Sequence, residues 1–183
     1  MTRKKYDAYY TPAWQTHALL RRQEITGVVL DPCNGDGAIS RLITRSHTIT
    51  NDINPDVTAD MHVDAADGAS YETHFGEVDW VVTNPPYSMP LCSDIVAHAV
   101  THAKVGVAML LRLSFLEPIA KKQPRPRGEW LRTHPPTKTL VLPRYSYTRN
   151  GKSDSCTTAW MIWIKGERNQ TLACLYDEDS YRL

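Results

Sequence analysis

Residues 27–37 read GVVLDPCNGDG, and this stretch decides the fold. Its first five residues are mostly apolar, include β-branched valines, and predict a buried strand that ends at Asp31. The glycines that follow predict a tight turn, and residues 38–45 carry apolar side chains at helical spacing. A strand, a glycine turn and a helix in this order open a doubly wound α/β sheet.

The remaining elements continue this alternation. Apolar runs predict strands at 48–52, 61–65, 78–83 and 105–116, and helical spacing predicts helices at 13–22 and 91–103. Five prolines between residues 117 and 136 predict a loop with a short helical piece at 129–132. Strands at 139–142 and 158–164 predict an antiparallel hairpin that closes an otherwise parallel sheet. No pattern after residue 166 predicts an element.

The length and charge distribution fit one domain that meets two kinds of ligand. The 183 residues suffice for a single core, and the net charge is +1. Residues 46–103 contain no Lys or Arg, whereas residues 117–153 hold nine basic residues against two acidic ones. The first region therefore suits a cationic ligand and the second a polyanion such as nucleic acid.

Cysteine spacing and hydropathy predict a soluble cytoplasmic protein. The four cysteines lack C-x-x-C spacing, so the sequence indicates neither a metal site nor a disulfide framework: Cys33, Cys92, Cys156 and Cys174. The basic, polar start is unlike a signal peptide, and no apolar run approaches the ~20 residues needed to span a membrane.

Acidic residues at predicted strand ends favour one class of cofactor. The motif Gly35-x-Gly37 has Ser40 where a dinucleotide-binding fingerprint requires a third glycine. Asp31 precedes this turn, and its carboxylate would repel a pyrophosphate but attract an ammonium or sulfonium group. S-adenosylmethionine is therefore favoured over a dinucleotide. Asp52 is expected to bind the ribose hydroxyls, and Asp67, with Asp64 as the alternative, to accept from the adenine amine.

The sequence Asn84-Pro85-Pro86-Tyr87 follows the predicted strand at 78–83. Each proline fixes its own φ and restricts the residue before it, so the loop is stiff. The Asn84 side-chain oxygen and the Pro85 carbonyl can accept both hydrogens of a planar amine, and Tyr87 can stack on a flat heterocycle. A proline-rich structural turn is the alternative interpretation.

Together these motifs resemble the amino-methyltransferases of the class I S-adenosylmethionine-dependent family, above all the small phage-type DNA adenine-N6 methyltransferases. The motif order, cofactor before catalysis, is similar to the γ arrangement of that family. The family often has an aromatic residue where Cys33 stands. The resemblance implies cofactor contacts at Tyr9, Tyr10, Thr11, Pro12, Asp31, Pro32, Cys33, Gly35, Gly37, Asp52, Ile53, Asp67 and Asn84, and catalysis by Asn84, Pro85, Pro86 and Tyr87.

The same resemblance implies a Rossmann-like, seven-stranded, mostly parallel sheet with its last strand antiparallel. Residues 9–116 would form the cofactor and catalytic core, and residues 117–156 would contact nucleic acid. We expect no separate target-recognition domain within residues 1–183, because the core fold takes nearly all of them. The nucleic-acid contacts expected in the basic segment are Arg125, Arg127, Arg144, Tyr147, Arg149 and Lys152.

The implied reaction is direct methyl transfer to the exocyclic amine of an adenine flipped out of DNA, in a bacterial or phage-infected cell. An RNA base and a protein glutamine are alternative substrates. A catalytically inactive nucleic-acid-binding subunit with the same fold is the alternative from another class. The sequence leaves open whether the protein is a monomer or a homodimer.

Overall fold

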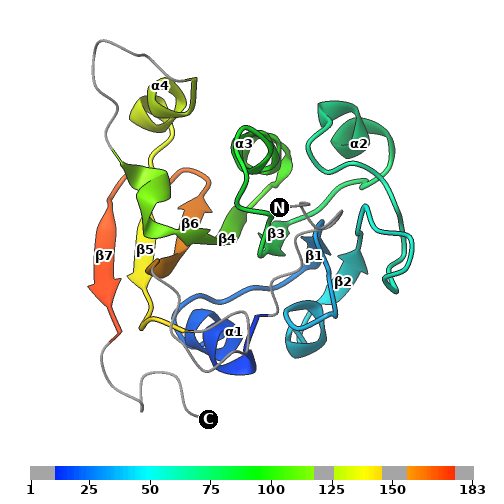
Figure 1. Ribbon diagram of the computed structural model, residues 1–183, viewed down its shortest axis with the longest axis horizontal. Helices are drawn as coiled ribbons and strands as arrows, with labels where there is room; N and C mark the ends of the chain where they lie inside the picture. The colour runs from blue at the N-terminus through cyan, green and yellow to red at the C-terminus, as the bar shows by residue number, and fades with distance from the viewer. Residues whose placement is uncertain (1–10, 118–125, 146–155, 176–183) are drawn as a thin grey trace, which may run out of the picture.

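The computed structural model describes residues 11–117, 126–145 and 156–175, which form a seven-stranded sheet with helices on both faces (Figure 1). The sheet order is β2-β1-β3-β4-β6-β5-β7. The strands are β1 (Val28–Asp31), β2 (His47–Thr50), β3 (Trp80–Thr83), β4 (Gly106–Arg112), β5 (Lys138–Val141), β6 (Thr158–Ile164) and β7 (Thr171–Cys174). Only β6 among them runs against its neighbours, β4 and β5.

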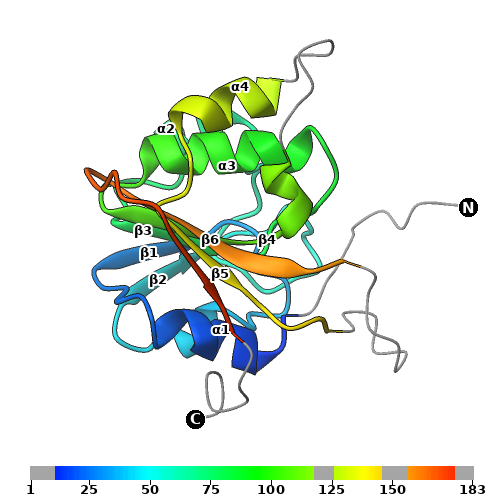
Figure 2. The ribbon, with the colours of Figure 1, turned by 90° about the vertical axis from the view of Figure 1, so that its left-hand side faces the viewer.

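The helices form two layers around the sheet. One face carries α2 (Gly68–Thr73), α3 (Leu91–His102) and α4 (Pro126–Thr133), and the other carries α1 (Ala13–Leu20), as Figures 1 and 2 show. Two 3-10 turns complete the described elements, η1 (Ser40–Leu42) and η2 (Leu113–Leu116). A sheet covered on both faces explains the nearly continuous apolar runs of β3, β4 and β6.

Alternate residues along each strand enter opposite cores. Val107, Met109 and Leu111 of β4 pack toward α2 and α3 in one core, while Ala108 and Leu110 pack toward α1 in the other. Both cores extend across several strands, so the central strands hold the two helical layers together.

Trp160 of β6 ties α1 to the sheet. Its side chain is fully buried, and its Nε1 donates a 2.7 Å hydrogen bond to the backbone oxygen of Gln15. The contact satisfies the indole N–H of a large core residue and holds α1 in place. Thr11, at the start of the same segment, contacts Asn84 after β3.

Gly106→Ala is expected to lower the free energy of unfolding by about 2 kcal/mol through overpacking. A Cβ at Gly106 would lie 2.6 Å from Cζ3 of Trp80 and 2.8 Å from the backbone oxygen of Trp163. Urea denaturation measures the change. Val105→Ala, at an exposed neighbouring position, is the control and should cost much less. Equal effects of the two substitutions would contradict the crowding at Gly106.

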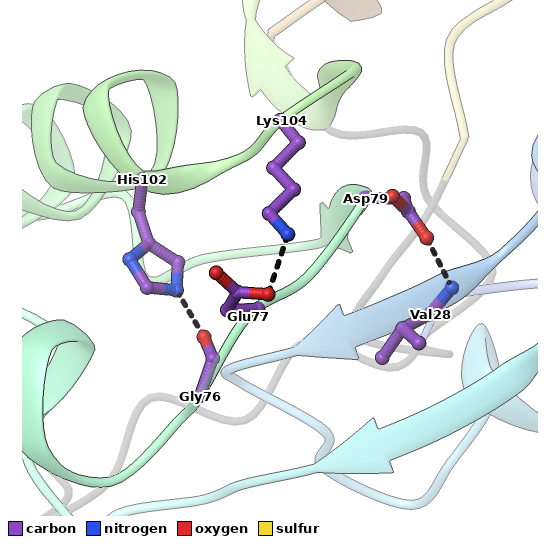
Figure 3. A network of polar contacts seen from close by, with 6 residues as sticks. All are labelled: Val28, Gly76, Glu77, Asp79, His102 and Lys104. Carbon is purple, nitrogen blue, oxygen red and sulfur yellow. Dashed lines mark hydrogen bonds and ion pairs between the residues drawn. The ribbon is translucent and has the colours of Figure 1, made fainter.

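Polar contacts hold the amino-terminal edge of the sheet (Figure 3). Asp79 Oδ2 accepts a 2.8 Å hydrogen bond from the Val28 backbone N–H, which joins the starts of β1 and β3. Nearby, Lys104 pairs with Glu77 at 2.6 Å, and His102 Nε2 lies 2.7 Å from the Gly76 oxygen. The Lys104–Glu77 pair is exposed, so its contribution to stability is small. These contacts lie at the edge opposite the strand carboxyl ends.

The predicted fold class is confirmed, including the seven-stranded, mostly parallel sheet and the hairpin of β5 with β6. The antiparallel strand, however, is β6 and not the last strand, as the resemblance implied. The strand expected at 61–65 is wrong, because only Met61 pairs with the sheet, as a single parallel bridge to Asn51. The seventh strand is instead β7, in the segment that carried no sequence signal, and it runs parallel to β5.

Two helical predictions also require correction. The helix expected over 38–45 is only the 3-10 turn η1, although Ile39 and Ile43 are buried as the pattern predicted. The helix α2 was not predicted, and Asp67 caps it by accepting a 3.0 Å hydrogen bond from the Ala69 N–H. The last residues of the strand predicted at 105–116 form η2 rather than continuing β4.

Candidate functional site

The predicted site residues meet where three adjacent parallel strands end. Asp31 is the last residue of β1, Asp52 follows β2 by two residues, and Asn84 directly follows β3. Strand β1 pairs with β2 on one side and β3 on the other. The carboxyl ends of the three strands therefore share one edge, where ligands of open α/β sheets bind.

Asp31 is a buried carboxylate at the centre of this edge, with a relative exposure of 1%. Its Oδ1 accepts hydrogen bonds from Thr83 Oγ1 at 2.7 Å and from the Cys33 backbone N–H at 3.3 Å. Among the described residues, Oδ2 has no hydrogen-bond partner. Burial raises the pKa of Asp31 to about 7, the two hydrogen bonds oppose that rise, and the nearby charge of Asp52 adds to it.

The glycine turn positions Asp52. Gly35 and Gly37 have φ values of 54° and 75°, which L residues with a Cβ rarely adopt. This conformation lets the Gly35 N–H donate a 2.8 Å hydrogen bond to Asp52 Oδ2. Asp52 Oδ1 accepts from the Asn54 N–H at 2.9 Å. Both carboxylate oxygens are thus oriented, and each keeps a lone pair for a ligand hydroxyl.

Ile53 lies next to Asp52 and is 53% exposed, one of few large apolar side chains exposed among the described residues. An exposed isoleucine beside an oriented carboxylate can pack against the flat face of a base whose ribose the carboxylate holds. Asp64 and Asp67 are both exposed, and each accepts from a backbone N–H two residues further on, Asp64 from Ala66 and Asp67 from Ala69.

Asn51 is a structural residue of this site that the sequence did not reveal. It is fully buried, and its Nδ2 donates to the backbone oxygens of Pro32 at 2.9 Å and Val63 at 3.1 Å. Its Oδ1 accepts from the Val63 N–H at 2.9 Å. The Asn51 side chain therefore joins the glycine-turn segment to the 61–63 segment. Its own amide nitrogen and oxygen are both hydrogen-bonded, as buried polar atoms usually are.

Cys33 contributes packing. Its side chain is half-buried against the core beneath α2 and α3. Burial raises the pKa of the thiol well above its usual range, and the charges of Asp31 and Asp52 raise it further. Since the thiolate is the reactive form of cysteine, this raised pKa disfavours a nucleophilic role for Cys33.

The segment before α1 reaches the proline loop. Asn84 Nδ2 donates a 3.0 Å hydrogen bond to Oγ1 of Thr11, a residue 73 positions away that is only 7% exposed. This bond turns the amide so that Oδ1 points away from Thr11. Thr83, which donates to Asp31, directly precedes Asn84. Asp31, Thr83, Asn84 and Thr11 are thus joined by two hydrogen bonds and one peptide link.

Tyr87 carries a cationic partner that the sequence did not predict. The guanidinium carbon of Arg112, at the end of β4, lies 5.1 Å from the centroid of the Tyr87 ring. This distance is within the range of cation–π attraction, which helps to orient the ring. Arg112 therefore lies over one face of the Tyr87 ring.

Several solved structures share this architecture, whereas no protein-family model and no curated protein sequence matches the chain. A Listeria monocytogenes protein assigned as a class I S-adenosylmethionine-dependent methyltransferase is 12% identical, with a TM-score of 0.53. An Agrobacterium tumefaciens protein assigned as an O-methyltransferase is 14% identical, with a TM-score of 0.57. A modification subunit assigned to a type I restriction enzyme of Vibrio vulnificus YJ016 is 9% identical, with a TM-score of 0.56.

The alignments cover 90%, 90% and 93% of this chain, respectively. The chain has the fold of the class I methyltransferases. It spans 63% of the Listeria protein, 86% of the Agrobacterium protein and 48% of the Vibrio subunit.

Within this methyltransferase fold, two of the predicted nucleic-acid contacts are described. Arg127 belongs to the first turn of α4, and its guanidinium carbon lies 5.5 Å from the centroid of the Phe115 ring. Arg144 is exposed just after β5. The other predicted nucleic-acid contacts, and two predicted cofactor contacts, lie outside the described residues: Arg125, Tyr147, Arg149 and Lys152, and Tyr9 and Tyr10.

The described part of this methyltransferase fold contains neither a candidate membrane span nor a candidate metal site. None of its helices is long and apolar enough to cross a membrane. Its histidine, cysteine and acidic side chains form no cluster of three or more that could hold a metal ion.

Proposed function

We propose that this chain binds S-adenosylmethionine at the carboxyl edge of β1, β2 and β3 and methylates the exocyclic amine (N6) of adenine in DNA. The observation that carries the proposal is the chain of contacts from buried Asp31 through Thr83 to Asn84 and Thr11. It links a carboxylate suited to a cation with an amide suited to a planar amine. The neighbour assigned as S-adenosylmethionine-dependent supports the choice of cofactor.

The donor set fits this cofactor. Among described residues, Asp31 Oδ2 is buried without a partner, so it can accept from or pair with a cationic group. Asp52 presents two oriented oxygens to vicinal ribose hydroxyls, and Ile53 offers an apolar surface to the adenine ring. The bound cofactor would supply an electrophilic methyl group on a sulfonium. The glycine turn would allow close approach, because no described atom lies within 4 Å of a Cβ built on Gly35.

The proline loop would activate the acceptor. An adenine amine is a weak nucleophile because its lone pair is delocalised into the ring. Hydrogen bonds to Asn84 Oδ1 and the Pro85 carbonyl would favour the geometry in which that lone pair is localised and aimed at the methyl group. Thr11 would keep the amide in the required orientation. Tyr87 would stack on the flipped base.

A DNA substrate is favoured by two observations. The residues between 117 and 153 are strongly basic, which suits a polyanion better than a protein glutamine. One structural neighbour is assigned as a modification subunit of a restriction enzyme. An adenine in RNA is the second candidate acceptor, since the Asn84 loop would bind the same amine there.

Sequencing that detects methylated bases tests this proposal in cells. DNA from cells that express the protein should contain N6-methyladenine at defined sites, and DNA from cells that express Asn84→Ala should not. Methylation confined to RNA would move the assignment to the second candidate. Methylation absent from all nucleic acids, with the protein folded and expressed, would refute the proposal.

Cofactor binding is expected to weaken as the pH falls below 7, because the raised pKa of Asp31 keeps its carboxyl protonated there. Only the ionised carboxylate attracts a cation, so binding must release a proton. The association constant should fall about tenfold between about pH 8 and about pH 6. Titration calorimetry measures it, and Asp31→Asn should remove the dependence. Equal affinity of the wild type at both pH values would contradict this role for Asp31.

A further inference from the structure

A pocket of about 230 Å³ lies beside the proline loop. It is bounded by Tyr87 of the loop, the end of β4, the turn η2 and the first turn of α4. Its lining includes two arginines and one acidic residue: Arg112, Arg127 and Glu117. Leu111, Phe115 and Cys92 supply apolar surface. The pocket therefore combines a partly apolar wall with an excess of one positive charge.

Among the described residues, the two guanidinium groups of this pocket have no hydrogen-bond acceptor or ion-pair partner. Arg112 lies over Tyr87 and Arg127 over Phe115, and both side chains are half-buried. In the described part of the chain, neither guanidinium is within hydrogen-bond or ion-pair distance of an acceptor, Glu117 included. Guanidinium groups carry five donors in a rigid fork that matches a carboxylate or phosphate. An anion bound in this pocket could accept hydrogen bonds from both guanidinium groups.

Both positive charges act at the pocket wall formed by Cys92. Burial raises the pKa of the Cys92 thiol to about 12, and the charges of Arg127 and Arg112 oppose that rise. The opposition means that the two guanidinium groups lie near the same buried point, although they belong to different elements. Their fields therefore add inside the pocket rather than over separate surfaces.

We propose that this pocket, the Arg112–Arg127 pocket, binds a phosphodiester group of the substrate strand beside the nucleotide presented to Asn84. The inference rests on the proposed function, since the pocket shares Tyr87 with the loop that would hold the base. A single phosphodiester charge matches the excess positive charge of the lining. Bidentate contacts from two arginines would fix the backbone and thereby place the flipped base.

Arg112 and Arg127 would act as positioning residues. Arg112 orients the Tyr87 ring from one face while its donors remain available to the phosphate. Phosphate and base would then be held on adjoining sides of one aromatic ring. Because this contact is to the backbone, it would position the strand without selecting the base sequence.

A scan with neutral phosphate analogues tests the pocket. Single methylphosphonate linkages are placed in turn along an adenine-containing oligodeoxynucleotide, and kcat/KM for methyl transfer is measured. With wild-type protein, one or two positions flanking the target adenine should show a loss of about tenfold, the usual effect of removing a charged hydrogen-bond partner. The double variant Arg112→Gln and Arg127→Gln should have a lower kcat/KM on every oligonucleotide. With this variant, a methylphosphonate at the same positions should cause no further loss relative to the unmodified oligonucleotide.

Arg132→Gln is the matched control, because Arg132 is exposed on the same helix α4 and does not line the pocket. This variant should keep the wild-type pattern. Thermal unfolding confirms that the double variant is folded. A position-specific loss that persists in the folded double variant, or a wild-type scan without any such position, would overturn the proposal.

A second measurement separates failure of the pocket from failure of the proposed function. Isotope-labelled protein is titrated with inorganic phosphate, and the side-chain N–H signals of its arginines are followed by NMR. Signals assigned to Arg112 and Arg127 should shift together, while that of Arg132 should not. If the wild type methylates no nucleic acid, the proposed function fails, and the titration alone then decides whether the pocket binds an anion. No shift at either arginine would refute the site.

Discussion

Asn84→Ala is expected to reduce kcat for methyl transfer by roughly a hundredfold to a thousandfold while changing cofactor affinity by less than about threefold. The Asn84 side-chain oxygen would contact the acceptor amine most strongly when the lone pair of the amine is localised. Removing this oxygen therefore raises the barrier to methyl transfer and leaves the free energy of cofactor binding nearly unchanged. The hydrogen bond from Nδ2 to Thr11 is also lost, but it contributes only to orientation. Single-turnover kinetics with labelled cofactor measures the chemical step directly.

Thr11→Val separates orientation from direct contact. It removes the hydroxyl that accepts from Asn84 Nδ2 and keeps the shape of the buried side chain. We expect Thr11→Val to have a kcat between those of the wild type and Asn84→Ala.

The thermal unfolding temperature of Asn84→Ala should change little, whereas the same substitution in a purely structural proline turn would lower stability. Wild-type turnover by Asn84→Ala would refute the catalytic role of the loop.

Asp31→Asn is expected to weaken cofactor binding by roughly tenfold to a hundredfold, the cost of losing a charged partner. The same substitution should stabilise the fold at neutral and higher pH. The pKa of Asp31 is raised by burial from 3.8 to about 7, which corresponds to roughly 4 kcal/mol against the ionised form in the folded state. Asparagine keeps an oxygen for Thr83 and the Cys33 N–H but carries no charge.

The sign of this stability effect follows from proton binding. Between about pH 4 and about pH 7, the folded state holds a proton on Asp31 that the unfolded state has released, so the free energy of unfolding falls as pH rises. The destabilisation by Asp31 is therefore complete above about pH 7 and relieved by acid. We expect Asp31→Asn to raise the free energy of unfolding by about 1 to 3 kcal/mol at about pH 8. The gain is smaller than the full penalty because the new Nδ2 takes the place of the unpartnered Oδ2 and would be a buried donor without an acceptor.

Calorimetry and denaturant unfolding test the two effects together. Asp36→Asn is the matched control, since Asp36 is exposed in the same turn. It should change neither cofactor affinity nor stability appreciably. If Asp31→Asn bound the cofactor as tightly as the wild type, or if it were less stable than the wild type at high pH, Asp31 would not be a buried carboxylate held for a cation.

The positions of β1 to β6 were predictable because each of these strands has an apolar or β-branched run in the local sequence. The apolar runs that form β1, β3 and β6 can be accommodated only in a sheet covered on both faces, and the structure has that sheet. The segment 61–65 resembles such a run, but the side chain of Asn51 bonds both backbone groups of Val63. Hydrogen bonds from a side chain thereby take the place of the backbone hydrogen bonds of a strand. The periodicity of the sequence does not distinguish these two cases.

The helix predicted over 38–45 illustrates a second limit. Its apolar spacing correctly predicted which side chains are buried, since Ile39 and Ile43 enter the core. Spacing alone does not make a helix of eight residues stable, because nucleation is costly and tertiary packing decides short segments. Here the packing accommodates the same buried residues in the short turn η1.

The candidate site divides in the same way. Asp31, Asp52 and Asn84 were predictable because the carboxyl ends of parallel strands must share an edge. The contacts that orient them were not, since Thr11 is 73 residues from Asn84 and Arg112 reaches Tyr87 from another strand. Such pairs depend on how α1 and β4 pack, which no local pattern encodes.

The most direct measurement identifies the methylated atom. Purified protein is incubated with labelled S-adenosylmethionine and adenine-containing DNA, the product is digested to nucleosides, and the label is located by chromatography and mass spectrometry. The proposed geometry at Asn84 predicts label on the exocyclic amine of adenine, and roughly a hundredfold to a thousandfold slower labelling with Asn84→Ala. Label on cytosine, on protein or on no nucleoside from wild-type reactions would contradict adenine methylation by this site.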